Sequence, residues 1–243
     1  MANFEEIGQG VLDPVENQGY CVDISICLDR TGSMAPIIDE VKDNALAFCD
    51  KFHKAMEANG KNVDQLRVKV IPFRDYAYDG AKAMDDSGFF SLPEQNREFR
   101  AYVSGIAANG GGDAPENALE AMALAMRSDW TRSGSKRRHV ILVFTDASAV
   151  PLQDSRRTAS EYYPADMPAD LAQLGDMWSG CSQEMEGMPE ERAARMVLFV
   201  PNEQPWSDMQ VWNNVWPSFS KAGNGLEEVD IDLAINLLVN SVG

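Results

Sequence analysis

The sequence predicts an α/β fold in which helices cover a mostly parallel β-sheet. Apolar segments rich in β-branched residues alternate along the chain with segments of helical periodicity. His139–Thr145 (HVILVFT) is almost continuously apolar, as a strand covered on both faces is. With 243 residues, 44% of them hydrophobic, the chain is long enough for one sizeable core. We therefore expect a single domain over residues 1–243.

Short, mainly apolar runs are predicted to be the strands of this sheet. The principal ones are Tyr20–Leu28, Leu66–Phe73, His139–Thr145 and Arg195–Val200. Pro72 predicts that the second of them ends there or lies at a sheet edge, because proline has no N–H to donate to a neighbouring strand. One further short strand is expected within Tyr78–Leu92.

Apolar residues at helical spacing predict the helices that connect these strands. The predicted helices are Met34–Met56, Glu94–Ala108, Ala114–Ser128 and Asp230–Val242. Pro115 fits the first turn of the third helix, where its missing N–H is not needed. Trp212 and Trp216 are four residues apart, so one helical face can carry both, either in the core or at a partner surface.

About fifty residues separate the strand that ends at Thr145 from the strand that begins at Arg195, far more than one helix and two short loops need. We interpret residues 147–194 as an insertion. Helices are expected near Ala169–Ser179 and Pro189–Ala194. The methionines of this insertion and Trp178 can either cover the sheet or form an adaptable binding surface.

The charge of the chain excludes several classes of partner. Its 21 basic and 38 acidic residues give a net charge of −17, which repels the phosphates of nucleic acids and of anionic membranes and favours cations or basic surfaces.

No apolar stretch approaches the roughly 20 residues of a membrane span, and Met1–Gly10 lacks the pattern of a signal peptide. Four cysteines without CxxC spacing suggest reduced thiols. We expect a cytoplasmic protein.

Three polar segments carry the candidate chemistry. They are Asp29–Met34 (DRTGSM), Gly110–Glu116 (GGGDAPE) and Thr145–Ser148 (TDAS). Two of them directly follow predicted strands and the third opens a predicted helix, so they can converge where the strand order of an open sheet reverses.

These segments offer oxygen ligands of the kind that a hard divalent cation prefers. The candidate ligands are Asp29, Thr31, Ser33, Asp113 and Asp146, and Asp75 is a candidate second-shell residue. Alternate positions in one tight loop can aim the oxygens of Asp29, Thr31 and Ser33 to the same side. Two histidines are too few for a histidine-based site, and no soft ligand favours zinc or copper. The set predicts Mg²⁺ or Mn²⁺ ahead of Ca²⁺.

Each of these residues also has a structural alternative. Asp113 and Ser33 can cap the helices that follow them, and Asp146 can stabilise a turn at a strand end. Asp75 can be solvated or pair with Arg74. Asp29 is the hardest to explain structurally, because an acid that ends a buried strand is costly without a partner.

Together the three segments resemble the metal-ion-dependent adhesion site of the von Willebrand factor A family. DRTGSM is similar to its DxSxS loop with threonine at the first hydroxyl position, and FTDAS is similar to its third loop. The resemblance implies a Rossmann-like three-layer α/β/α open sheet, mostly parallel, with one antiparallel edge strand. The DxTGSM and GGGDxPE forms resemble the bacterial intracellular group that includes tellurite-resistance-type proteins, whose members act as adaptors in multiprotein or stress-response systems.

Asp113 stands where many members of that family have threonine. Three carboxylates would already offset the charge of a dication. We therefore expect tighter intrinsic metal binding and a weaker preference for a carboxylate supplied by a partner.

Three interpretations of these motifs are possible, and the intact set of oxygen ligands argues against one of them, a scaffold that keeps the fold with an empty metal site. Of the other two, the first is a non-enzymatic module that binds Mg²⁺ or Mn²⁺ and docks another protein at its metal face. The alternative is a magnesium-dependent phosphatase of the haloacid-dehalogenase kind with Asp29 as nucleophile. That class normally has a second aspartate two positions later, where this chain has Thr31, and no phosphate-binding GxxxxGK is present.

Overall fold

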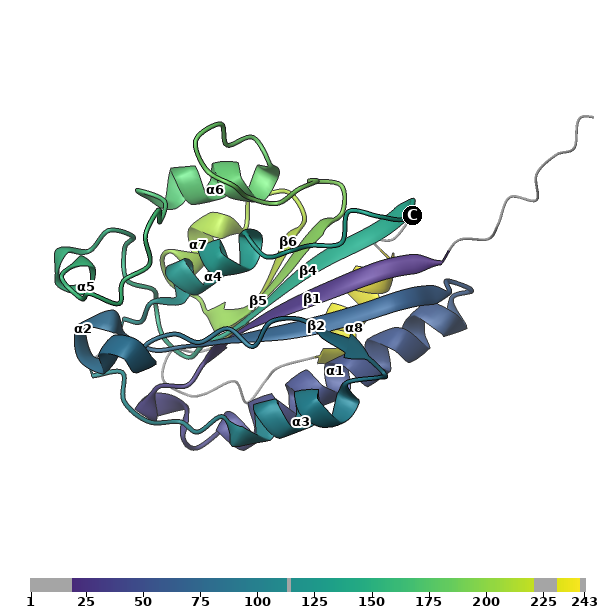
Figure 1. Cartoon of the computed structure of the whole chain (residues 1–243), viewed down its shortest axis with the longest axis horizontal. Helices are drawn as coiled ribbons and strands as arrows, with labels where there is room; N and C mark the ends of the chain where they lie inside the picture. Colours follow the sequence, from purple (N-terminus) through teal and green to yellow (C-terminus); the bar gives the residue numbers. More distant parts are fainter. Residues whose placement is uncertain (1–18, 113–114, 221–230, 241–243) are drawn as a thin grey trace, which may run out of the picture.

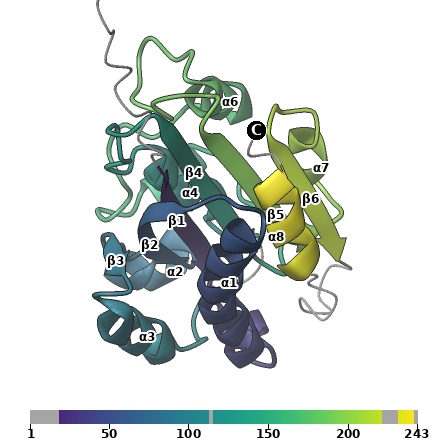
Figure 2. The ribbon, with the colours of Figure 1, turned by 90° about the vertical axis from the view of Figure 1, so that its right-hand side faces the viewer.

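The computed structural model describes residues 19–112, 115–220 and 231–240. Its centre is a six-stranded sheet in the order β3-β2-β1-β4-β5-β6, with helices on both faces (Figures 1 and 2). Every neighbouring pair is parallel except β2 and β3, which is antiparallel. The predicted three-layer, mostly parallel architecture with one antiparallel edge strand is therefore confirmed.

The strands are β1 (Tyr20–Asp29), β2 (Val63–Phe73), β3 (Phe90–Leu92), β4 (Lys136–Phe144), β5 (Ala194–Pro201) and β6 (Val215–Ser220). Pro72 is the last residue but one of β2 and pairs with Leu28 of β1. The edge strand β3 pairs only with Leu66–Val68, so Pro72 lies beyond its reach. Pro72 thus marks a strand end, one of the two positions predicted for it.

The helices are α1 (Ile38–Ala58), α2 (Tyr76–Asp79), α3 (Asn96–Gly105), α4 (Ala118–Met126), α5 (Ser155–Thr158), α6 (Leu171–Ser179), α7 (Trp206–Met209) and α8 (Ile231–Asn240), with 3₁₀ turns η1 (Gly32–Met34) and η2 (Gly80–Lys82). Figure 1 shows α1, α3 and α8 on one side of the sheet and α4, α6 and α7 on the other. No helix among the described residues is long and apolar enough to cross a membrane.

Two apolar clusters form the core, one on each face of the sheet. The alternation of side chains along each strand divides them: Leu142 and Phe144 of β4 pack with α1 and α8, while Ile141 and Val143 pack with α4 and α6. The central strands are covered on both faces, which is why their sequences are continuously apolar.

The helix predicted from Ala114 begins four residues later, at Ala118, so the prediction that Pro115 lies in its first turn is wrong. Glu116 instead bridges to Ala149 in the loop after β4. Its N–H donates to the Ser148 carbonyl (3.2 Å) and its carbonyl accepts from Val150 N–H (2.8 Å). These bonds to a distant segment replace the first helical turn and hold the second polar segment against the third.

Two further predictions are wrong. Residues 189–193 form a turn rather than a helix, since Ala194 is recruited into β5, where it pairs with His139. Trp216 lies in β6 rather than on a helix, and it packs on the α1 face whereas Trp212 packs on the α4 face. Pairing with β5 outweighs the helical spacing of these two tryptophans.

Candidate metal centre

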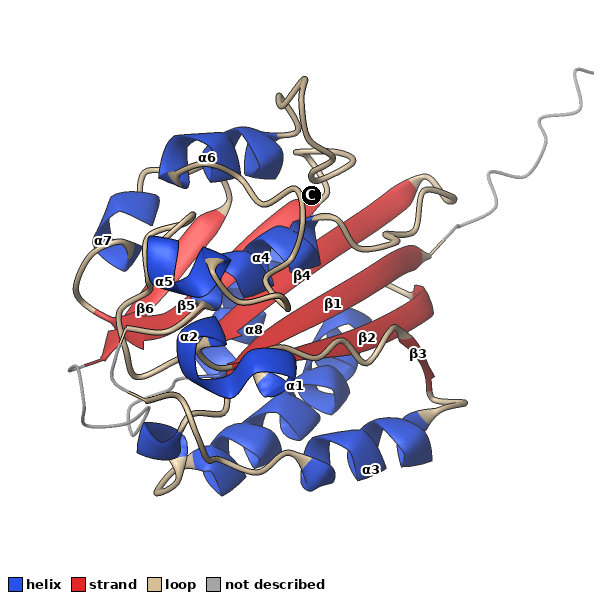
Figure 3. Ribbon diagram, turned by 60° about the vertical axis from the view of Figure 1, so that its left-hand side comes forward, coloured by secondary structure: helices blue, strands red, loops and turns tan. Residues whose placement is uncertain are grey.

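The candidate site lies at the carboxyl ends of β1 and β4. From β1 the chain continues to β2 on one side, whereas β4 lies on the other side of β1, so the strand order reverses between these two strands. Such a point opens a crevice in an α/β sheet. Figure 3 shows β1 and β4 side by side. Leu28 pairs with Phe144, which brings Asp29 and Thr145, the residues that follow this pair, to the crevice together.

Asp29 is fully buried at the end of β1, and both of its carboxylate oxygens accept hydrogen bonds. The Thr31 N–H donates to Oδ1 (2.8 Å), and the Thr145 hydroxyl donates to Oδ2 (2.6 Å). Burial raises the pKa of Asp29 to about 6, against the opposing effect of these two hydrogen bonds, and the charge of Asp146 raises it further. A bound cation would remove this cost of holding a carboxylate in the interior.

The side-chain oxygens of Thr31, Ser33 and Asp146 are consecutive neighbours. Thr31 Oγ1 lies 3.0 Å from Ser33 Oγ, and the Ser33 hydroxyl donates to Asp146 Oδ1, also at 3.0 Å. Two ligands at right angles, each about 2.1 Å from an octahedral Mg²⁺, lie about 3.0 Å apart. The spacing and the all-oxygen set therefore fit a hard divalent cation that replaces these hydrogen bonds.

The glycine run before α4 is fastened to the loop after β1. The Gly32 N–H donates to the Gly110 carbonyl (3.0 Å), and the Asn109 N–H donates to the Arg30 carbonyl (3.0 Å). Gly111 has a φ of +91°, and a Cβ at this position would lie 2.6 Å from Thr31 Cγ2. Only glycine allows this close approach of the two loops.

Asp113 lies outside the described residues, so the structure places four of the five predicted ligands. Within the described part of the chain, no three Asp, Glu, His or Cys side chains are grouped so as to hold a metal ion by themselves. The set at β1 and β4 instead combines the carboxylates of Asp29 and Asp146 with the hydroxyls of Thr31 and Ser33.

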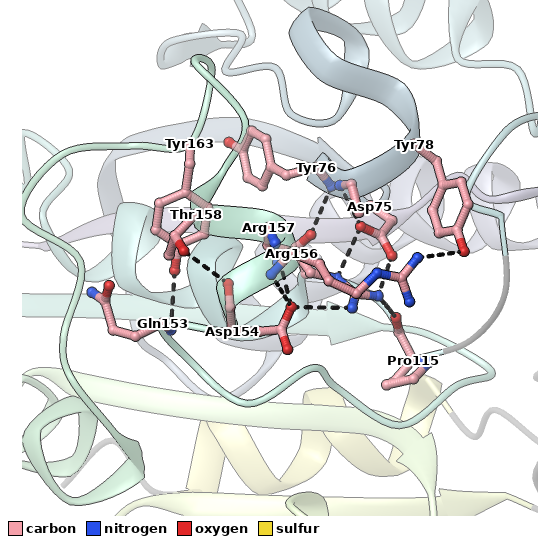
Figure 4. A network of polar contacts seen from close by, with 12 residues as sticks. Asp75, Tyr76, Tyr78, Pro115, Gln153, Asp154, Arg156, Arg157, Thr158 and Tyr163 are labelled. Carbon is pink, nitrogen blue, oxygen red and sulfur yellow. Dashed lines mark hydrogen bonds and ion pairs between the residues drawn. The ribbon is translucent and has the colours of Figure 1, made fainter.

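Asp75 is fully buried one strand away, and its carboxylate is engaged with other groups. It caps α2 by accepting from the Ala77 N–H (2.6 Å) and forms an ion pair with Arg157 of α5, whose Nε donates to it at 3.0 Å (Figure 4). Two of the alternatives considered for Asp75 are therefore wrong: it is not solvated, and it does not pair with Arg74, which faces Asp79 (3.6 Å). The partner of Asp75 comes from the long segment between β4 and β5.

Glu116 is a residue of this region that the sequence motifs did not single out. It is 3% exposed, and its Oε2 has no hydrogen-bond partner among the described residues. Burial, with the nearby charges of Asp29, Asp75 and Asp79, raises its pKa to about 9. In the sequence Glu116 looks like an ordinary acid in the first turn of a helix. Its position three residues after Asp113, in a segment already assigned to the site, is the feature from which it could have been recognised as a residue of this region.

The sequence and the fold are both similar to those of known proteins. A model of the von Willebrand factor A domain matches residues 23–159, more than half of the chain. The chain belongs to the von Willebrand factor A domain family. The matched range contains all three polar segments, and members of this family generally mediate protein–protein interactions.

This von Willebrand factor A domain spans less than half the length of the relatives that it matches. It is 30% identical over 127 residues to "Alpha-protein kinase vwkA" of Dictyostelium discoideum, which covers 52% of this chain and 18% of that protein. It superposes with a TM-score of 0.51 on proximal thread matrix protein 1 from the mussel byssus (10% identity, 92% of this chain and 48% of that one). The pilus adhesin SpaC of Lactobacillus rhamnosus GG gives the same TM-score (12% identity, 93% and 31%). At these identities the two structures show the fold alone.

Proposed function

We propose that this von Willebrand factor A domain is a metal-dependent interaction module, which binds Mg²⁺ or Mn²⁺ and docks a partner protein at its metal face. The observation that supports the proposal best is the set of neighbouring oxygens from Thr31, Ser33 and Asp146, in which consecutive oxygens lie 3.0 Å apart, close to the buried Asp29. The spacing suits an octahedral cation, and the two carboxylates offset its charge.

Asp113 would add a third carboxylate to this set, and it is proposed as a ligand from its place in the sequence. Glu116 lies close enough to Asp29 for their charges to interact, but among the described residues it is not grouped with Asp29 and Asp146 as a third ligand. With three carboxylates, the centre would hold its metal without a carboxylate from the partner.

Metal binding is tested by calorimetry and thermal unfolding with Mg²⁺, Mn²⁺, Ca²⁺ or chelator. A cation present at a free concentration one hundred times its Kd stabilises the folded state by about 2.7 kcal/mol. Asp29→Ala is expected to abolish this response, whereas Asp43→Ala, an exposed aspartate on α1, retains it. Asp113→Thr is expected to bind Mg²⁺ more weakly than the wild type.

Docking is tested by affinity purification of partners from the source cells, with Mg²⁺ or with chelator, read by mass spectrometry. We expect a partner that is retained with Mg²⁺ and lost both in chelator and with Asp29→Ala. Equal recovery under all three conditions contradicts metal-dependent docking.

The phosphatase alternative is less well supported by the geometry. Asp29 is fully buried, and both of its oxygens accept hydrogen bonds, which leaves it poorly placed to attack a phosphoryl group. We propose that the domain has no catalytic activity of its own. A phosphatase assay with Mg²⁺, with Asp29→Asn as control, tests this directly.

We also propose a reducing, cytoplasmic setting, as in the bacterial adaptor proteins that its motifs resemble. All four cysteines are free thiols, and burial raises the pKa of Cys27 and Cys49, so both are protonated and unreactive. Fractionation of the source cells, followed by detection of the protein, tests the location.

A further inference from the structure

An apolar groove lies on the face of the sheet that carries α4, α6 and α7. Its volume is about 350 Å³. Its walls come from α4, the loop after β4, the start of α6, and α7 with the segment before it. Figure 1 shows α4, α6 and α7 on the same side of the sheet. The apolar lining includes Leu119, Leu152, Leu171 and Pro205. We call it the α6 groove.

Among the described residues, the only charged ones that line the α6 groove are Asp170 and Asp208. Both are exposed, and within the same part of the chain neither forms an ion pair with lysine or arginine. Two neighbouring hollows along α6 have Asp176, Glu184 and Glu191 in their lining and, as far as the structure describes the chain, no basic residue. The potential around the groove is therefore negative and unbalanced.

The groove is held in shape without a ligand. Leu119 and Leu152 are 2% and 7% exposed, so its floor belongs to the core. Asp170 caps α6 by accepting from the Gln173 N–H (2.9 Å), and the Trp178 Nε1–H of α6 donates to the Asn213 carbonyl (2.8 Å). Preformed walls lower the entropic cost of binding.

We propose that the α6 groove binds a segment of a partner protein that presents an apolar side chain next to lysine or arginine. The apolar side chain fills the hollow, and the cation meets Asp170 and Asp208, which have no basic partner among the described residues. Such a contact needs no metal ion. The groove is therefore a second docking surface, separate from the metal centre, although Ala149 in its lining follows Asp146 by only three residues.

The test uses three short synthetic peptides, in which lysine alternates with leucine, glutamate alternates with leucine, or lysine alternates with serine. Each is titrated into the full chain in the presence of chelator and followed by NMR of leucine methyl groups. We expect only the lysine–leucine peptide to shift Leu119, Leu152 and Leu171. Asp29→Ala should bind this peptide as the wild type does, so the result is independent of the proposed metal site.

The double variant Asp170→Asn with Asp208→Asn is expected to bind the lysine–leucine peptide about fivefold more weakly than the wild type, because two exposed ion pairs are lost. Asparagine retains the helix cap. The control is Asp43→Asn, an exposed aspartate of α1 on the other side of the sheet, which should leave binding unchanged. Equal binding of the glutamate or serine peptide, shifts elsewhere, or no binding overturns the proposal. Leucine shifts that depend on protein concentration alone would show that a second copy of this chain occupies the groove, which also overturns it.

Discussion

Asp29 illustrates how a single residue can be costly to the apo protein and useful to the metal-bound one. It is fully buried, and burial raises its pKa to about 6. Above that pH the folded protein holds an ionised carboxylate in its interior, beside the negative charge of Asp146. A residue kept only for stability would not be expected here.

Asp29→Asn separates the two roles. In chelator at pH 8 the variant should be more stable than the wild type by about 1–2 kcal/mol, because the raised pKa means that ionisation opposes folding, and this penalty is fully present above about pH 6. With Mg²⁺ the order should reverse. Urea unfolding in both conditions measures the difference; a variant that is destabilised in chelator would contradict the ligand role.

His139 is a second buried titratable residue, far from the metal centre at the start of β4. It is 1% exposed, its Nε2 lies 2.9 Å from the Thr131 carbonyl, and its Nδ1 has no partner among the described residues. Burial lowers its pKa, so the folded state favours the neutral ring.

The contribution of His139 to the free energy of unfolding should therefore fall between pH 6.5 and 5, by at most about 1.4 kcal/mol per pH unit, because the unfolded state then binds a proton that the folded state does not. Protonation of Asp29 acts in the opposite direction in this range, so the contribution of His139 is read as a difference between proteins: the stability of His139→Gln relative to the wild type should rise as the pH falls from 6.5 to 5, whereas that of His53→Gln, on the solvent-accessible side of α1, should not. Urea unfolding of the three proteins across this pH range measures it. A relative stability of His139→Gln that does not change with pH would contradict the prediction.

At the scale of elements, the centre depends on loops rather than on helices. The loop after β1 and the glycine run before α4 hydrogen-bond to each other, and Asp79 of α2 accepts from the Gly111 N–H (2.8 Å). The ligands are thus positioned by three segments that are far apart in sequence.

Gly111→Ala tests this arrangement. Its φ of +91° and the 2.6 Å approach of a new Cβ to Thr31 should destabilise the fold by about 1–3 kcal/mol and weaken Mg²⁺ binding at least tenfold. Gly105→Ala is the matched control, since a Cβ there meets no atom within 4 Å. Calorimetry and thermal unfolding provide the two measurements, and unchanged metal affinity would show that the loops are not coupled in this way.

At the scale of the whole molecule, one buried ion pair joins the segment between β4 and β5 to the edge of the metal centre. Arg157 pairs with both Asp75 and Asp154, and Arg156 beside it donates to the Tyr78 hydroxyl (2.8 Å) (Figure 4). The long segment is therefore part of the fold rather than a detached loop.

Arg157→Met leaves Asp75 buried without its cation and should cost about 3–5 kcal/mol. Adding Asp75→Asn should restore part of the loss, because no unpaired charge then remains. The side chain of the neighbouring Arg156 makes only exposed contacts, so Arg156→Met should change stability by less than about 0.5 kcal/mol. Urea unfolding compares the four proteins. A loss no larger for Arg157→Met than for Arg156→Met would show that the pair is not structural.

The sequence by itself determined which segments form the strands β1, β2, β4 and β5 and the helices α1, α3, α4, α6 and α8, and it determined the position of the polar segments. Strand and helix periodicities are local properties, and the ends of parallel strands necessarily share one edge of the sheet. For that reason Asp29, Thr31, Ser33 and Asp146 could be predicted to converge, and the structure brings these four together. Their role as metal ligands, and that of Asp113, stays a prediction.

Only the tertiary structure decided the features that depend on contacts between distant segments. The later start of α4 follows from the bridge between Glu116 and Ala149, and β6 from its pairing with β5. The ion pair between Asp75 and Arg157 joins residues 82 positions apart. In each case long-range pairing and burial outweighed the local preference, and local preference is all that a sequence pattern records.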